Sequence, residues 1–199
     1  MSRKYLHLDT ESTGLTTQHG LIEIGFIIDI DGEVKEEHIF KMKPFPTDLI
    51  ADEALEITGY TREEIMEFED PIIVKDKILK IFDKYINKYD KTDKMKLFGF
   101  NLRVFDFPML IAWFNKCGEN YLGSYIDYKS KFDVLGFLEN MRIMRLLPES
   151  NKTKLTEVCE EYEIELIDAH SSIADIRATR ELAYKLGKLV KKNLRGDVF

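Results

Sequence analysis

The chain has 199 residues, 44% of them hydrophobic and 33% charged, with a formal net charge of −7. This composition excludes a disordered chain, and the length suits one domain with a sizeable core, or at most two small ones. No apolar run approaches the ~20 residues that span a bilayer, and no signal-peptide pattern opens the sequence. Cys117 and Cys159 lie far apart with no CxxC motif, so we expect reduced core thiols in a cytoplasmic protein.

The acidic balance disfavours a protein that coats duplex DNA by neutralising many phosphates. It is compatible with an enzyme that grips a few nucleotides through metal ions, because bound cations reverse the local field. Basic residues gather near the end of the sequence, at Lys185, Lys188, Lys191, Lys192 and Arg195. This pattern is typical of a solvated helix face and tail.

The first predicted strand, residues 5–11, ends in acidic side chains. Successive side chains of a strand point to opposite faces. Leu6 and Leu8 therefore point to one face, and the other face carries Tyr5, His7, Asp9 and Glu11. The two carboxylates lie about 7 Å apart along the backbone. The negative charge of such a pair is unfavourable at the end of an apolar strand unless it is neutralised. A divalent cation, or two cations about 3.5–4 Å apart, would neutralise it. The alternative is that both acids are ordinary turn residues, with Gly14 closing the turn. We expect His7 to be a hydrogen-bonded core histidine.

Two further strands are predicted to complete an antiparallel meander. Residues 21–29 are dense in Ile and Phe, which indicates a buried strand. Asp31-Gly32 is a tight hairpin signal, and residues 33–40 follow as the third strand.

Three helices are predicted next. A short one over 53–57 ends at Gly59, and a capping box from Thr61 to Glu64 starts the second. Asp70-Pro71 opens a longer helix, since Asp is a favoured N-cap and Pro a favoured first residue. Its expected apolar stripe comprises Val74, Ile78, Ile81, Phe82, Tyr85 and Tyr89.

The remaining chain alternates strands and helices. The predicted order is a strand over 95–99, a helix over 106–116 ended by Gly118, a short strand within 125–133, a helix over 134–146 ended by Pro148, a helix over 155–162, and a long helix from Ser171 or Ser172. A meander followed by this alternation predicts an α/β fold, a mixed sheet with helices on both faces. In such sheets, sites form at strand ends where the strand order reverses, as at the end of residues 5–11.

Two more acids and a histidine stand at element junctions. Asp106 opens a helix after the fourth strand, Asp175 lies in the first turn of the last helix, and His170 precedes that helix. Singly, each is more readily explained as a capping acid or a structural histidine. Together with Asp9 and Glu11, they predict a two-metal centre with a base beside it.

At this point the sequence resembles the DnaQ-like 3′–5′ exonucleases, over roughly residues 4–186. The matching segments are Asp9–Leu15, Glu23–Gly25, Glu53–Thr61, Asn101 with Phe105 and Asp106, Leu155–Ile164, and His170 with Asp175. The five-residue spacing from His170 to Asp175 is that of the histidine (DEDDh) branch. Phe100 stands where many members have histidine, Ser172 where alanine is usual, and one more residue than usual separates Asn101 from Asp106.

The resemblance implies an RNase H-like fold, here a five-stranded mixed sheet of a three-strand antiparallel meander plus two parallel strands. It also implies two Mg²⁺ or Mn²⁺ ions bridged by Asp9. Glu11 and Asp175 would hold the ion that activates water, Asp106 would help hold the other ion, and His170 would take the proton from the attacking water.

Four further positions are implied to bind substrate, namely Thr10, Leu15, Asn101 and Phe105. Leu15 occupies the position that packs on the terminal base in relatives. For Leu15 a core role after the turn is an equal alternative.

The implied function is metal-dependent 3′–5′ exonuclease activity on DNA, with single strands favoured, releasing nucleoside 5′-monophosphates in proofreading or repair. The expected partners are nucleic acid and a DNA polymerase or repair complex, with no membrane. Two alternatives stay open: a 3′–5′ exoribonuclease, and a non-catalytic subunit of a polymerase or repair complex, against which the intact acids argue. We expect one domain over 1–199, with a core at about 4–186 and a basic tail at about 191–199.

Overall fold

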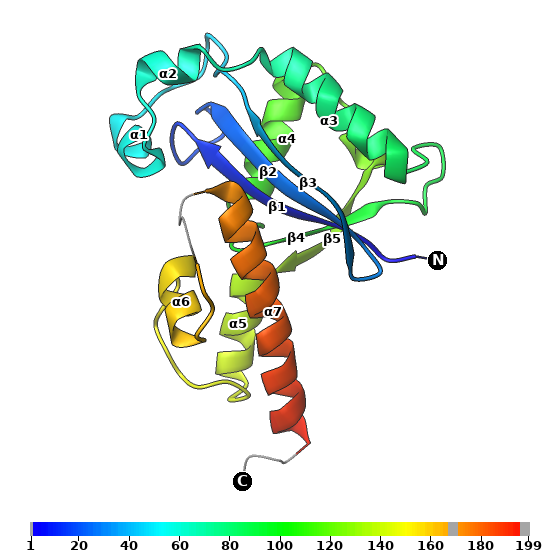
Figure 1. Ribbon diagram of the computed structural model, residues 1–199, viewed down its shortest axis with the longest axis vertical. Coiled ribbons are helices and arrows are strands. Elements are labelled where there is room, and N and C mark those ends of the chain that lie inside the picture. The colour runs from blue at the N-terminus through cyan, green and yellow to red at the C-terminus, as the bar shows by residue number, and fades with distance from the viewer. Residues whose placement is uncertain (1, 167–170, 196–199) are drawn as a thin grey trace.

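The computed structural model describes residues 2–166 and 171–195, and its centre is a five-stranded sheet (Figure 1). The strands are β1 (Lys4–Ser12), β2 (Leu21–Ile30), β3 (Glu33–Lys41), β4 (Met95–Gly99) and β5 (Ile126–Asp133). Their order is β3-β2-β1-β4-β5. β1, β2 and β3 pair antiparallel, whereas β4 pairs parallel with both β1 and β5. The predicted meander plus two parallel strands is confirmed.

Helices cover both faces of this sheet (Figure 1). They are α1 (Asp52–Thr58), α2 (Arg62–Met66), α3 (Pro71–Tyr85), α4 (Asp106–Lys116), α5 (Val134–Ile143), α6 (Leu155–Glu161) and α7 (Ser172–Leu194), with a 3₁₀ turn at Leu122–Ser124. α3 and α4 lie on one face, and α5 and α7 on the other. None of these described helices is long and apolar enough to cross a membrane.

The predicted helix boundaries rest on caps that the structure contains. Gly59 ends α1 with a φ of 74°, a conformation that glycine adopts without strain. Thr61 and Glu64 form the reciprocal capping box of α2, with bonds of 3.1 and 2.8 Å. The Asp70 carboxylate accepts a 2.9 Å hydrogen bond from the backbone N–H of Ile72 at the start of α3.

The alternation predicted for β1 divides the interior into two cores. The core beneath α3 and α4 takes Leu6 and Leu8, together with Phe26, Val74, Ile78, Phe82, Leu97, Leu110 and Trp113. The second core joins α5, α6 and α7 and includes Val134, Leu138, Val158, Leu182 and Leu186. Cys117 and Cys159 are free and buried, one in each core, as expected. β3 is an edge strand, with charged side chains along much of its exposed length.

Two helices end earlier than predicted. α3 ends at Tyr85, because the backbone of Ile86 is extended and the Lys4 ammonium donates a 2.6 Å hydrogen bond to the Tyr85 carbonyl. Tyr89 therefore lies outside the apolar stripe of α3, and its side chain is 87% exposed. α5 ends at Ile143, five residues before Pro148. Arg145 adopts a φ of +60°, which terminates the helical path before the proline is reached.

His7 is buried as expected, but the predicted hydrogen bond is wrong. Neither ring nitrogen has a hydrogen-bond partner among the described residues. Nε2 lies 3.7 Å from Oδ2 of Asp29, and that oxygen already accepts from Arg180 at 2.8 Å. Burial lowers the pKa of His7 to about 4, so the ring is neutral at pH 7.

Close approach of α7 to β2 depends on Gly25. A Cβ at this position would lie 2.6 Å from the Cβ of Ser172, closer than packed carbons approach. Gly25→Ala is expected to lower the free energy of unfolding by about 1–3 kcal/mol, the usual cost of overpacking. Chemical denaturation measures this.

The matched control is Gly187→Ala, on the exposed side of α7, where an added Cβ meets nothing within 4 Å. It is expected to stabilise by roughly 0.5–1 kcal/mol through helix propensity. Equal effects of the two substitutions would contradict the close contact at Gly25.

Candidate active site

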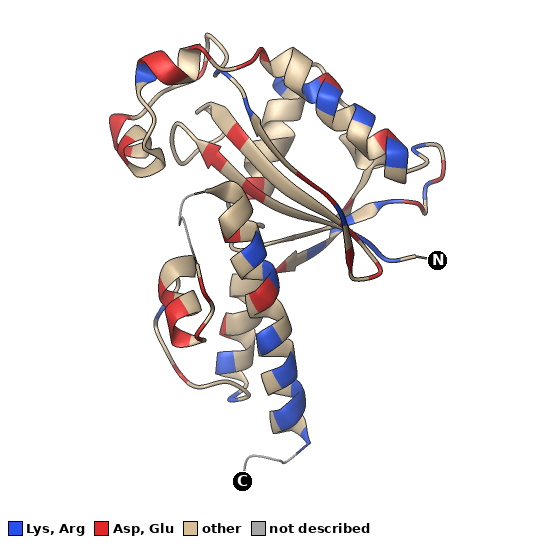
Figure 2. Cartoon of the chain, in the orientation of Figure 1, with Lys and Arg blue, Asp and Glu red and all other residues tan. Residues whose placement is uncertain are grey.

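Two predicted ligands, Asp9 and Glu11, lie at the carboxyl end of β1 and are half-buried. Both point to the face that α7 covers, and they pair in the β1–β2 register with Gly25 and Glu23. Figure 2 shows acidic residues gathered where β1, β2 and the start of α7 meet. The junction is therefore strongly acidic.

Asp106 is buried at the start of α4. The Thr10 hydroxyl donates a 2.8 Å hydrogen bond to its Oδ1. Burial raises the pKa of Asp106 to about 7, while hydrogen bonds from Thr10 and from its own backbone N–H lower it and nearby Asp133 raises it. Thr10 thus ties the Asp106 carboxylate to β1.

The pKa values of Asp9 and Glu11 show that these acids act on one another. Burial raises the pKa of Asp9 well above its usual range, and repulsion by Asp106, Glu11, Asp175 and Glu23 adds to the shift. Burial also raises the pKa of Glu11 to about 8, with repulsion by Glu23, Asp175 and Asp106. The four predicted acids therefore lie within electrostatic reach of one another.

Glu23 also belongs to this acidic junction. From the sequence it is predicted only as a residue of the second strand. It is buried, and Ser172 at the start of α7 donates a 2.5 Å hydrogen bond to its Oε1. Tyr60, after α1, donates to Oε2 at 2.9 Å. The available signal was a charged residue inside the otherwise apolar run of Leu21–Ile28. Glu23 holds the start of α7, and with it Asp175, against the sheet.

The last predicted ligand, Asp175, lies in the first turn of α7, which begins at Ser172 as expected. Its charge acts on both Asp9 and Glu11. The predicted base, His170, lies outside the described residues.

The donor set fits a hard divalent cation, because carboxylate oxygens are the ligands that Mg²⁺ and Mn²⁺ prefer. Burial raises the pKa values of Asp9, Glu11 and Asp106, with repulsion between neighbouring acids as a further cause, and a bound cation would offset both effects. Within residues 2–166 and 171–195, no group of three or more His, Cys, Asp or Glu side chains could hold a metal ion as arranged. Ion binding here would require these carboxylates to turn towards a common point.

The four predicted substrate-binding residues lie in different surroundings. Leu15 is 84% exposed, so its alternative as a core residue is wrong. Thr10 is buried and bonded to Asp106. Asn101 adopts a φ of +54° after β4, and Phe105 is half-buried against the core below α4.

The turn that presents Leu15 is braced on both sides. Ser12 donates to the Gly14 carbonyl at 2.6 Å, and Thr13 donates to the Leu49 carbonyl at 2.6 Å. The His19 ring fills the space that a Cβ on Gly14 would need. These contacts fix an apolar side chain in solvent beside the acidic junction.

A comparison of the sequence with models of protein families assigns the chain to a family. A model described as "RNase_T: Exonuclease" matches residues 6–183. The chain belongs to this exonuclease family. No curated protein matches the sequence.

Solved structures similar to the exonuclease domain include E. coli exonuclease I. Its complex with a dT13 oligonucleotide superposes with a TM-score of 0.78 at 22% identity, covering 98% of this chain and 43% of that one. The zinc-bound form of its complex with single-stranded DNA gives 0.76 at 22% identity, covering 97% and 41%. The chain therefore spans less than half of these exonuclease I chains, and at this identity the likeness concerns the fold.

The raised pKa values predict a pH dependence for the metal-free exonuclease domain. A folded-state acid with a raised pKa keeps a proton that the unfolded chain has lost, so stability falls as pH rises through the folded pKa. With Glu11 near 8, the free energy of unfolding should fall by roughly 1–2 kcal/mol from pH 6.5 to 8.5. Urea titrations in EDTA across this range measure it.

This window avoids His7, whose lowered pKa acts in the opposite direction below about pH 6.5. Glu11→Gln should reduce the slope and leave the part that Asp106, with a pKa of about 7, contributes. Glu56→Gln, on exposed α1, should leave the slope unchanged. A slope that Glu11→Gln does not alter would show that Glu11 ionises normally.

Proposed function

We propose that this domain is a divalent-metal-dependent 3′–5′ exonuclease that acts on single-stranded DNA and releases nucleoside 5′-monophosphates. The observation that carries the proposal is the set of mutually repelling, part-buried carboxylates where β1, α4 and α7 meet. Membership of the exonuclease family supports it. Acids concentrated in this way destabilise the metal-free fold, which is reasonable only where cations neutralise them.

The substrate is proposed from fold neighbours and charge. Exonuclease I was solved with dT13 and with other single-stranded oligonucleotides. The net charge of −7 disfavours extensive contact with a duplex, where many phosphates must be neutralised. We therefore propose single strands and frayed ends as better substrates than blunt duplex. A role in proofreading or repair, in complex with a polymerase or repair assembly, is proposed from the family resemblance alone.

In the proposed mechanism, Asp9, Glu11, Asp106 and Asp175 would hold the divalent cations. Glu11 and Asp175 would serve the ion that activates water, Asp106 would help hold the other ion, and Asp9 would serve both. Bound Mg²⁺ or Mn²⁺ would supply a polarised phosphate and a water of lowered pKa. Thr10 orients the Asp106 carboxylate through its 2.8 Å hydrogen bond.

The 3′ end is proposed to lie against the turn after β1. Leu15 is exposed there and would pack on the terminal base. An apolar contact of this kind can be made with any of the bases, so it requires no particular sequence. Asn101 and Phe105, between β4 and α4, are proposed to border the same nucleotide. Thr10, being buried, would act through Asp106 rather than by touching the strand.

The decisive assay incubates 3′-recessed and blunt duplex DNA, single-stranded DNA and RNA of one sequence with the protein and Mg²⁺, Mn²⁺ or EDTA. Stepwise shortening from the 3′ end of single-stranded DNA is expected with either metal and none in EDTA. Asp9→Ala should abolish turnover without loss of fold. Asp76→Ala, which removes an exposed acid on α3, is the matched control and should keep full activity.

Full activity in EDTA would contradict the proposed metal dependence. Full activity of Asp9→Ala would show that the active site lies elsewhere. Faster loss of RNA would favour the exoribonuclease alternative, since only contacts to the 2′-hydroxyl separate the two substrates. Inactivity on all substrates, with retained binding of single strands, would favour the non-catalytic subunit.

His170 is proposed as the general base, a role that the resemblance assigns. A positioned base contributes about 10²–10⁴-fold, so His170→Ala should lower kcat by that factor with less effect on binding. The wild-type rate should rise between about pH 6 and 8 as an imidazole loses its proton. Single-turnover pH profiles of both proteins, with Mn²⁺ titrations, test this.

His38→Ala, on β3, is the matched control and should keep the wild-type pH profile. Near wild-type rates and an unchanged profile in His170→Ala would show that His170 merely precedes a helix.

A further inference from the structure

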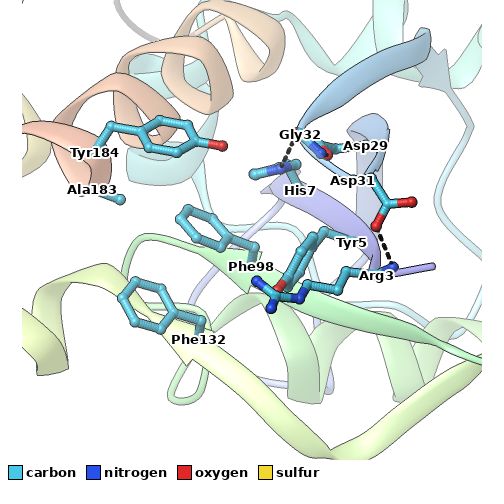
Figure 3. A pocket seen from close by; sticks show the side chains of 10 residues that line it. All are labelled: Arg3, Tyr5, His7, Asp29, Asp31, Gly32, Phe98, Phe132, Ala183 and Tyr184. Carbon is cyan, nitrogen blue, oxygen red and sulfur yellow. Dashed lines mark hydrogen bonds and ion pairs between the residues drawn. The ribbon is translucent and has the colours of Figure 1, made fainter. Parts of the chain in front are cut away.

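A cavity lies beside the acidic junction, under the same face of the sheet (Figure 3). Its volume is about 670 Å³, within the range of small-molecule sites. β1 contributes Tyr5 and His7, β4 and β5 contribute Phe98 and Phe132, and α7 contributes Tyr184. The lining residue nearest to Asp9 is His7, two residues or about 7 Å before it along β1. None of the four predicted acidic ligands lines the cavity, so it adjoins the proposed active site but is distinct from it.

The walls of this cavity are aromatic on two sides. Phe98 and Phe132 stack at 4.9 Å with planes 23° apart, and the His7 ring lies 4.5 Å from Phe98. Tyr184 faces them from α7 in Figure 3. Phe132 also packs on Phe137 at 5.4 Å, and the Arg180 guanidinium lies 5.3 Å from the Tyr184 ring. Phe132 is still 37% exposed and Tyr184 53% exposed, so both rings keep accessible surface. Facing aromatic walls favour a planar, aromatic occupant.

One end of the cavity is polar and electrically balanced. The backbone N–H of Arg3 donates to the Asp31 carboxylate at 2.7 Å, while the Arg3 guanidinium makes no ion pair with any described residue. Asp29 accepts from Arg180 at 2.8 Å and from the Gly32 backbone N–H at 2.7 Å. Two arginines thus offset two aspartates, which suits a neutral ligand with donors and acceptors at its edge rather than an anion.

We propose that this cavity binds a neutral, planar heteroaromatic compound of nucleobase size, such as a nucleoside. The ring would lie between the Phe98–Phe132 pair and Tyr184, and its polar edge would reach Arg3 and Asp31. A purely apolar ligand would leave the charged end desolvated without hydrogen bonds, which is unfavourable. A phosphate would meet the Asp31 carboxylate at the rim.

The test is calorimetric titration of the full chain in EDTA with adenosine, thymidine, ribose and AMP. Both nucleosides are expected to bind, ribose is not, and AMP should bind no more tightly than adenosine. Phe132→Ala and Tyr184→Ala should each weaken nucleoside binding about tenfold, as loss of one stacked ring typically does. Tyr121→Ala, which removes a 76% exposed ring elsewhere, is the matched control and should change nothing.

Both test variants remove exposed rings outside the proposed catalytic machinery, so folding and nuclease rate should be retained. Failure of either nucleoside to bind at millimolar concentration would overturn the proposal. So would equal binding by ribose, or binding unaffected by both substitutions. Nucleoside binding that is lost in Asp9→Asn but kept in Tyr184→Ala would assign it to the acidic junction and also overturn the proposal.

Discussion

The hydrogen bond between Ser172 and Glu23 is the contact on which the rest of the structure depends. It joins the first residue of α7 to a buried carboxylate of β2, directly above the space left by Gly25. Because α7 is a continuous helix, fixing its start also fixes Asp175 against β1 and brings Tyr184 over the aromatic wall of the sheet. Removing one partner would leave a buried polar group without its bond, which costs about 1–3 kcal/mol.

The acidic junction gathers buried carboxylates at a cost in stability. Asp9, Glu11 and Asp106 are drawn out of water and towards one another, which raises all three pKa values. Proteins that function at such sites commonly gain stability when the crowded charges are removed. The apolar burial in the two cores on either side of the sheet offsets this unfavourable clustering of acids. The proposed active site therefore combines locally unfavourable charge with well-packed surroundings.

Most of the fold could be predicted because its signals are local. Alternation fixed the faces of β1, and caps such as Gly59 and Asp70 marked helix ends. Errors arose where distant contacts decide. The Lys4 ammonium donates to a carbonyl at the end of α3. Asp29 accepts a 2.8 Å hydrogen bond from Arg180, whereas His7 lies 3.7 Å from the same oxygen. The candidate acids were predictable from motif order, whereas the role of Glu23 depends on a partner 149 residues away in the chain.

The outer strand β3 has a consequence for association between molecules. An edge strand leaves half of its backbone donors and acceptors unpaired, and a second chain can add to them. In β3 the exposed run is interrupted by charged side chains, Glu33, Lys35, Glu37 and Lys41. An incoming strand would bring its own side chains against alternating charges and would have to strip them of water. These charges therefore disfavour the addition of a sixth strand at the β3 edge of the sheet.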